Sequence, residues 1–149
     1  MPSWSEIEAI EPAFADRVRR LFDAGRHKTI ATLRRDGSPR ISGIECDFRD
    51  GELRFSSMTG ARKLADLRRN PLFALHSPTS SPEPGREGEW PGEAKVFGTA
   101  LWQGSTSPDG EEFIGDIREA VITGLSGDAT RLVIHSWTFD HGLRLIERD

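Results

Sequence analysis

The sequence is poor in residues on which several classes of protein depend. It has one cysteine, Cys46, and four histidines among 149 residues. A single cysteine excludes an internal disulfide, and the scattered histidines do not give the ligand spacing of a zinc site, so we expect no metal. No apolar run approaches the roughly 18 residues of a membrane span, and the first residues lack the basic and apolar regions of a signal peptide. We therefore expect a cytoplasmic protein with no membrane partner.

Basic residues are not in excess. The chain has 20 Lys and Arg against 24 Asp and Glu, a formal net charge of −4, and this balance argues against nucleic acid as a partner. Apolar residues make up 36% of the chain, enough for a folded core. The length is typical of one domain. We expect residues 1–149 to form it, with a helical cover at 1–25 and a loop rich in proline, glycine and glutamate at 77–93.

Three consecutive segments alternate apolar and polar residues. They lie at 29–34, 40–48 and 52–57 and are separated by Asp36-Gly37 and Asp50-Gly51. Asp-Gly between alternating segments indicates a hairpin, because both residues tolerate positive φ. The sequence therefore predicts a three-stranded antiparallel meander.

Helical spacing appears in three places. Apolar residues from Trp4 to Phe22 predict an amphipathic cover interrupted near Pro12, and a short helix is expected at 61–70. A further helix is predicted to begin near Pro108, with an apolar face and a solvated acidic face. The apolar face is Phe113, Ile114, Ile117, Ala120 and Val121, and the acidic face is Glu111, Glu112 and Asp116.

Additional strands complete the predicted fold. They are expected at 72–76, 94–103, 131–138 and 143–147, and Gly98 would allow a bulge or a close backbone approach in the second of them. We therefore predict a mainly β protein, a six- to seven-stranded antiparallel β-barrel with helical covers.

Residues suited to binding a ligand are concentrated where the third predicted strand leads into the 61–70 helix. Ser56, Ser57 and Thr59 precede Arg62 and Lys63, which lie in the first helical turn. Cations there oppose the helix macrodipole, and a bound anion would reverse that penalty. Backbone N–H groups, hydroxyls and two cations together form a suitable cradle for a phosphate. The alternative is that both cations are simply solvated.

The order of these motifs resembles the pyridoxamine 5′-phosphate oxidase-like family of FMN-binding split barrels. The resemblance runs from about His27 to Trp102. It rests on Ile30-Ala31-Thr32-Leu33, Asp36-Gly37-Ser38-Pro39-Arg40, Leu53-Arg54-Phe55-Ser56-Ser57, Gly60-Ala61-Arg62-Lys63 and Asn70-Pro71.

The resemblance implies a cofactor and a place for it. FMN, or the deazaflavin coenzyme F-420 of relatives, would lie in a groove between the two subunits of a homodimer. Arg62 and Lys63 would hold its phosphate, and Ser56 and Ser57 would contact the phosphate or the ribityl chain. Arg40, Ile41 and Ser42 occupy the strand that borders the ring, and residues 96–100 resemble a strand of the dimer face.

Some residues depart from the family pattern. Glu45 stands where true pyridoxamine phosphate oxidases carry a basic residue, and Glu93 stands in place of an amide. No Arg-x-His pair lies near the C-terminus. Trp137 falls near a family tryptophan at the cofactor edge, although packing in the core is the favoured role. Vitamin B6 oxidation is therefore not the expected activity.

The leading hypothesis is an FMN-dependent oxidoreductase of unknown small-molecule substrate, in which the cofactor carries the chemistry and no catalytic side chain is required. An F-420-dependent reductase is the alternative in the same class. A non-catalytic flavin- or haem-binding carrier or sensor is the alternative of another class. Cys46 is expected to be a buried hydrophobe, and His76 and His135 to be structural. The 77–93 loop could be a lid or a docking element.

Overall fold

A computed structural model describes residues 3–149, apart from the side chains of residues 106 and 107. In chain order, its helices are α1 (Trp4–Ile10), α2 (Pro12–Asp23), α3 (Arg62–Arg69) and the 3₁₀ turn η1 (Glu87–Glu89). The strands are β1 (Lys28–Leu33), β2 (Pro39–Arg49), β3 (Glu52–Met58), β4 (Leu72–His76), β5 (Glu93–Ser107), β6 (Gly110–Leu125), β7 (Leu132–Thr138) and β8 (Gly142–Arg148).

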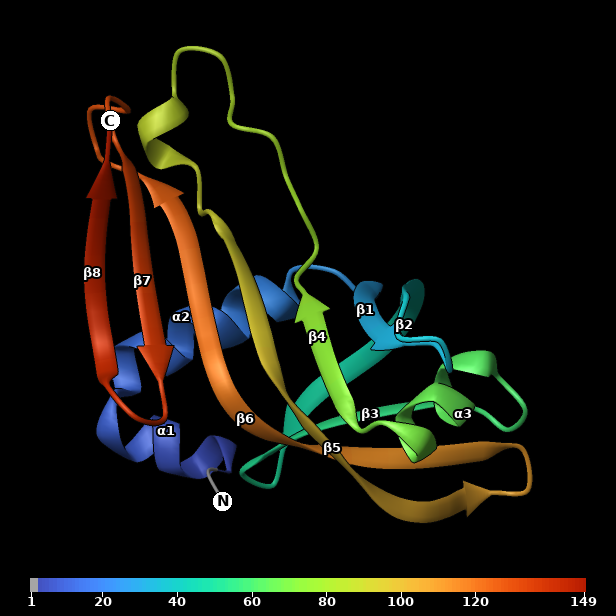
Figure 1. Ribbon diagram of the computed structural model, residues 1–149. Helices are drawn as coiled ribbons and strands as arrows, with labels where there is room; N and C mark the ends of the chain where they lie inside the picture. The colour runs from blue at the N-terminus through green and yellow to red at the C-terminus, as the bar shows by residue number, and fades with distance from the viewer. Residues whose placement is uncertain (1–2) are drawn as a thin grey trace.

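The eight described strands form one antiparallel sheet that closes on itself. Their order is β3-β2-β1-β4-β5-β6-β7-β8, and a further pairing joins β3 to β6. The first half of β6 pairs with β3, from Met58 opposite Gly110 to Leu53 opposite Gly115, and the second half pairs with β7. Strands β1 to β6 therefore make a closed barrel, and β7 and β8 extend the sheet beyond it (Figure 1). The predicted antiparallel barrel is confirmed.

The predicted meander and its turns are also confirmed. Strands β1, β2 and β3 pair in sequence, and β1 meets β2 with Leu33 opposite Pro39. Gly37 has φ of 87° and Asp50-Gly51 has φ of 56° and 75°. These left-handed conformations are the reason that Asp-Gly marks the two hairpins.

One predicted element is wrong: the segment from Pro108 onward is not a helix but strand β6. Phe113 and Ile117 face the core as alternate residues of a strand. The register of β5 and β6 then shifts, because Gly98 pairs with Ile117 but Phe97 pairs with Glu119, which leaves Arg118 as an extra residue. The next buried residue is Ala120. A bulge adds one residue to the two-residue alternation and so imitates helical spacing. Pairing with β5 along most of the strand outweighs the apparent periodicity.

The acidic residues of that segment are not a solvated face. Glu111 and Asp116 are buried, and Glu112 is nearly so. Glu112 accepts a hydrogen bond from Arg54 at 2.7 Å, and Glu111 accepts one from Trp102 Nε1 at 3.0 Å and forms an ion pair with Arg68. Buried carboxylates need such partners. Arg68 thereby ties α3 to the β5–β6 hairpin.

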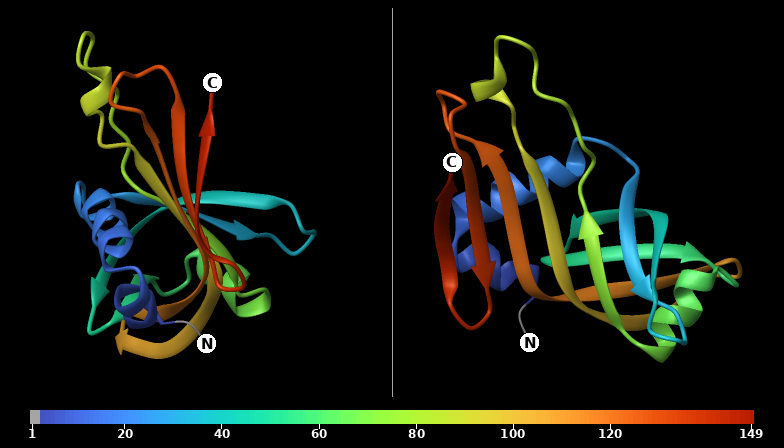
Figure 2. Two further views of the ribbon diagram at one scale, coloured as in Figure 1. Left: turned by 90° about the vertical axis from the view of Figure 1, so that its left-hand side faces the viewer. Right: turned by 45° about the horizontal axis from the view of Figure 1, so that its top comes forward.

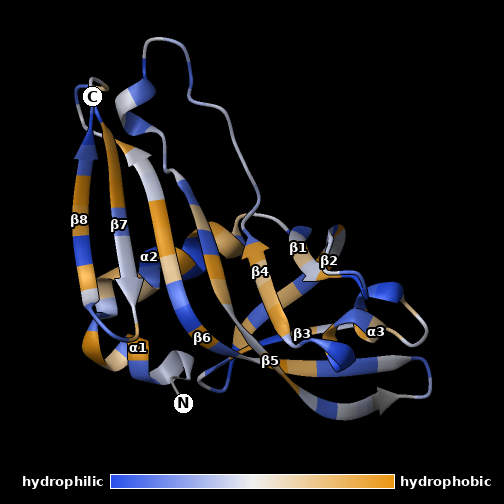
Figure 3. Ribbon diagram, viewed as in Figure 1, coloured by the Kyte–Doolittle hydropathy of each residue, from blue (hydrophilic) through white to orange (hydrophobic). Residues whose placement is uncertain are grey.

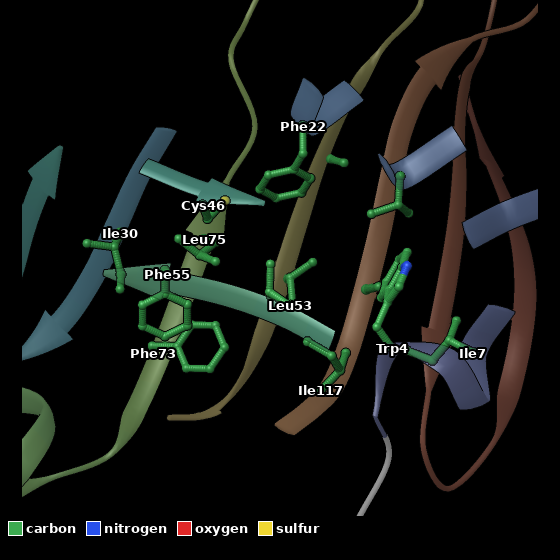
Figure 4. Packing of buried hydrophobic residues seen from close by; sticks show 14 of the residues in the cluster. Trp4, Ile7, Phe22, Ile30, Cys46, Leu53, Phe55, Phe73, Leu75 and Ile117 are labelled. Atoms are coloured by element: carbon green, nitrogen blue, oxygen red, sulfur yellow. The ribbon is translucent and has the colours of Figure 1, made fainter. Parts of the chain in front are cut away.

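The core fills the barrel and continues beneath the two N-terminal helices. Phe55 lies against Phe73 and Phe113, with ring centroids 5.0 and 5.8 Å apart. Trp4 and Phe22 from the helices meet Phe48 at 4.4 and 5.7 Å. Figure 4 shows core side chains meeting between strands and helices, and Figure 2 shows α1 and α2 on one side of the sheet. The helical cover therefore shares its core with the barrel.

Gly98 allows the close approach that its position predicted. A Cβ atom at Gly98 would lie 2.1 Å from the carbonyl oxygen of Asp116, whereas a Cβ at Gly43 in β2 would meet nothing within 4 Å. We expect Gly98→Ala to lower the free energy of unfolding by about 1–3 kcal/mol, because the backbone at the bulge must move. Gly43→Ala is the matched control and should lie within about 0.5 kcal/mol of wild type. Urea unfolding curves measure both, and equal stabilities would contradict the role assigned to Gly98.

Candidate functional site

A cavity of about 420 Å³ lies beside the start of α3. It is bounded by β2, the end of β3, the first turn of α3 and the tip of the β5–β6 hairpin. We call it the lysine cavity, after Lys63 on its wall. Its lining residues are His27, Gly43, Ile44, Glu45, Ser56, Ser57, Met58, Lys63, Asp109 and Gly110.

The first turn of α3 is open to an incoming anion. Gly60, with φ of 90°, turns the chain out of β3, and Ala61 takes the N-cap position in an extended conformation. No side chain caps the helix, and its first turn holds no acidic residue. Arg62 and Lys63 follow directly. Uncapped N–H groups beside cations favour a negatively charged ligand.

Lys63 lines the cavity and contacts β2. Its Nζ donates to the carbonyl oxygen of Gly43 in β2 at 3.1 Å. Ser56 is exposed and Ser57 half-buried at the end of β3, and both line the same cavity. The Thr59 N–H donates to the carbonyl oxygen of Asp109 at 2.9 Å, so the hairpin tip holds the turn that precedes α3. A carbonyl is a weaker partner for an ammonium group than a phosphate would be.

Glu45, which also lines the lysine cavity, forms an ion pair with Arg26. Its Oε1 accepts a hydrogen bond from Arg26 Nε at 2.8 Å, and both side chains are largely exposed. The ion pair offsets much of the repulsion that a lone carboxylate would exert on a phosphate nearby.

The predicted cofactor residues do not all meet in one cavity. Ser56, Ser57 and Lys63 line the lysine cavity, whereas Arg40 and Arg62 line a second cavity of about 450 Å³. The remaining two lie along β2: Ile41 is 74% exposed and Ser42 is half-buried.

Asp66 organises the second cavity, and it was not among the residues predicted from the sequence. Its carboxylate is buried and accepts hydrogen bonds from Arg40 Nε at 2.7 Å, Thr32 Oγ1 at 2.8 Å and Arg69 at 3.0 Å. Burial alone would raise the pKa of Asp66, but these hydrogen bonds outweigh it and hold the pKa below its usual value. An acidic residue beside Leu67 on the apolar side of a short helix was the available signal.

Cys46 is the buried hydrophobe that its alternation predicted. It is 8% exposed, and burial raises the pKa of its thiol to about 12. The thiolate is the reactive form. We therefore expect no alkylation of the native protein by iodoacetamide at pH 8 and complete alkylation in denaturant, read by intact mass. Rapid modification of the native protein would contradict this burial.

The remaining candidates are hydrogen-bonded or buried. His76 Nδ1 hydrogen-bonds the carbonyl oxygen of Ser77 at 2.8 Å, and its Nε2 lies 3.8 Å from Glu93 Oε1. Burial, and then the charge of Arg17, lower the pKa of His135. Trp137 is 4% exposed within the core. In residues 3–149, no three His, Cys, Asp or Glu side chains are grouped as a metal site, and no described helix has the length and apolarity to cross a membrane.

The fold is that of the pyridoxamine 5′-phosphate oxidase-like split barrels. No protein-family model and no curated protein matches the sequence significantly. A pyridoxamine 5′-phosphate oxidase-related FMN-binding protein of Nostoc punctiforme has a TM-score of 0.64 at 10% identity, over 93% of this chain and 96% of its own. PhzG of Burkholderia lata 383, in complex with tetrahydrophenazine-1-carboxylic acid, has a TM-score of 0.62 at 12% identity, over 98% of this chain and 92% of its own. An F420 reductase has a TM-score of 0.51 at 17% identity, over 68% of this chain and 94% of its own.

Proposed function

We propose that this protein is an FMN-binding oxidoreductase that acts on a small molecule. The observation that carries the proposal is the uncapped first turn of α3, whose Lys63 lines the same cavity as Ser56 and Ser57. A site of this kind suits the phosphate end of a flavin nucleotide. The similarity in fold to an FMN-binding protein supports the same cofactor.

The residues present fit that cofactor. Lys63 would exchange the Gly43 carbonyl for a phosphate oxygen, and the hydroxyls of Ser56 and Ser57 would donate to the phosphate or the ribityl chain. Arg62, one residue earlier, would approach the same phosphate from the other side of the helix start. FMN, when bound, supplies hydride transfer, and the chain supplies binding, orientation and exclusion of water.

The proposal includes a homodimer. Ile41 is exposed on the strand that would border the ring. A separate hollow of about 390 Å³ has three apolar lining residues, Leu72, Phe97 and Phe139, beside the polar residues Thr99, Arg118, Glu119, Thr138 and Asp140. These three side chains are 39%, 40% and 55% exposed. A second copy would cover this apolar surface and complete the cofactor groove.

An F-420-dependent reductase is the second candidate. It is favoured by the arginine-lined cavity next to the proposed phosphate site, because an acidic extension of the cofactor would find cations there, and by the fold likeness to an F420 reductase. True pyridoxamine phosphate oxidation is not proposed, because the sequence has no Arg-x-His pair near the C-terminus to hold the phosphate of that substrate.

Turnover is tested by mixing FMN-loaded protein anaerobically with NADH or NADPH and following the flavin absorbance. A redox-active site should bleach the flavin, and a quinone or oxygen should restore it. A bound flavin that stays oxidised with both donors would instead favour a non-catalytic carrier. Binding of F-420 without binding of FMN would favour the second candidate.

A further inference from the structure

Helix α2 lies on the sheet through an apolar face. Figure 3 shows hydrophobic and hydrophilic colour along this helix, which passes behind β6 and β7. Its buried residues are Phe14, Ala15, Val18, Leu21 and Phe22. Apolar packing has no charge to titrate, so a pH dependence of this cover must come from a polar contact.

Among the described residues, one side-chain hydrogen bond connects α2 to the sheet. A terminal nitrogen of Arg17 lies 3.5 Å from Nδ1 of His135 in β7. The arginines that follow, Arg19 and Arg20, pair with acidic residues of the same helix instead. Arg17 is exposed and His135 is half-buried, so the contact is accessible to water and to protons.

This contact determines which nitrogen of His135 is free of a proton. A guanidinium group has no acceptor, so Arg17 donates the hydrogen bond and Nδ1 accepts it. Neutral His135 therefore carries its proton on Nε2. A second proton can bind the ring only at Nδ1, the atom that accepts from Arg17. Protonation of His135 and its hydrogen bond to Arg17 exclude each other.

The strands around His135 offer no free carboxylate to balance a second proton. Its cross-strand neighbours are Ile122 in β6 and Leu145 in β8, neither of which is charged. The acidic residue further along β8, Glu147, forms an ion pair with Arg131 at 3.1 Å. The neighbouring strands therefore do not stabilise an imidazolium at this position.

Helix α2 offers no free carboxylate there either. Asp16, next to Arg17 in the sequence, forms an ion pair with Arg20 at 2.8 Å. A protonated His135 would face the Arg17 guanidinium, and the two cations would repel each other. Burial, and then the charge of Arg17, accordingly lower the pKa of His135. The folded state binds the proton less readily than the unfolded state.

We propose that Arg17 and His135 form a pH-sensitive latch for the helical cover. With His135 neutral, Arg17 holds α2 to β7. When His135 takes a proton, the hydrogen bond is lost, the two cations repel, and the packing of α2 on the sheet loosens. The latch should be fully closed above the ordinary histidine pKa of about 6.5 and should open as the pH falls below it. It contains no residue of the proposed flavin site and does not depend on that site.

NMR titration of the histidines in the full-length protein tests the contact. His135→Gln identifies the signal of His135 among the four histidines. Arg17→Ala should raise the pKa of His135, because it removes the repelling charge. Arg19→Ala is the matched control, since its exposed ion pair is with Asp23, and it should leave the titration unchanged. An unchanged pKa in Arg17→Ala would overturn the proposal.

Amide hydrogen exchange tests the loosening of α2. Between about pH 7.5 and pH 5.5, the range in which histidines titrate, protection of α2 relative to α3 should fall by about threefold or more. In His135→Gln this fall should be absent, because glutamine can accept from Arg17 but does not titrate. His141→Gln, in the exposed turn before β8, is the control and should behave like wild type. A constant protection ratio in wild type, or an equal fall in His135→Gln, would overturn the latch.

Discussion

Replacing Arg62 and Lys63 together by alanine should weaken FMN binding by about 3 kcal/mol or more, a factor of roughly 100 in the dissociation constant. Each change removes a charge-assisted contact to the phosphate, which is worth about 1.5–3 kcal/mol. The fold should survive, because Arg62 is exposed and Lys63 donates to a backbone carbonyl rather than to a buried carboxylate. Quenching of flavin fluorescence gives the affinity, and circular dichroism checks the fold.

The matched control is Arg19→Ala with Arg20→Ala on α2. These are also consecutive basic residues of a helix, and their ion pairs with Asp23 and Asp16 are exposed. Their loss removes the same charge from the chain but none from the lysine cavity. If the Arg62/Lys63 variant binds FMN as tightly as this control, the assignment of the phosphate to α3 is wrong.

Asp66→Ala should destabilise the protein by about 3–5 kcal/mol at pH 7. The substitution leaves Arg40, which is 19% exposed, without its counter-ion, and the loss of one partner from a buried ion pair has that cost. Asp16→Ala is the control, because its ion pair with Arg20 at 2.8 Å is exposed and should be worth less than about 1 kcal/mol. Urea unfolding measures both variants.

The contribution of Asp66 should also depend on pH. Its pKa in the folded protein lies below the ordinary value, because hydrogen bonds from Arg40, Thr32 and Arg69 outweigh the effect of burial. The folded state therefore binds the proton less readily than the unfolded state. The stabilisation is fully present above the unfolded pKa of about 4 and is lost as the pH falls through the folded value. The difference between wild type and Asp66→Ala should shrink in acid, and a constant difference would contradict the assigned role.

Most of the barrel could be predicted because its turns are marked by local sequence. Asp36-Gly37 and Asp50-Gly51 mark hairpins through positive φ, and Pro12 and Pro71 mark the helix boundaries near them. Strand β6 could not be predicted, because its bulge at Arg118 gives an extended strand the apolar spacing of a helix. Pairing with β3, β5 and β7 is information that no single window of sequence contains.

Which candidate residues lie together could be predicted where they are neighbours in the sequence, and not where they come from distant segments. Ser56, Ser57 and Lys63 lie within eight residues of one another in the sequence, and they share one cavity. Asp66 was missed because its partners Thr32 and Arg40 are 34 and 26 residues away. Because Arg40 and Asp66 are far apart in the sequence, their contact could not be predicted either. Arg40 therefore lines the second cavity with Asp66, and the predicted cofactor residues are divided between two cavities.

The most direct test of the proposed flavin site is a comparison of FMN with riboflavin, which has the same ring and ribityl chain but no phosphate. Each is titrated into the wild-type protein, and flavin fluorescence is followed. We predict saturable binding of one FMN per chain and much weaker binding of riboflavin, because the cavity at Lys63 grips the phosphate. Equal affinity for the two flavins, or no binding of FMN, would contradict the assignment.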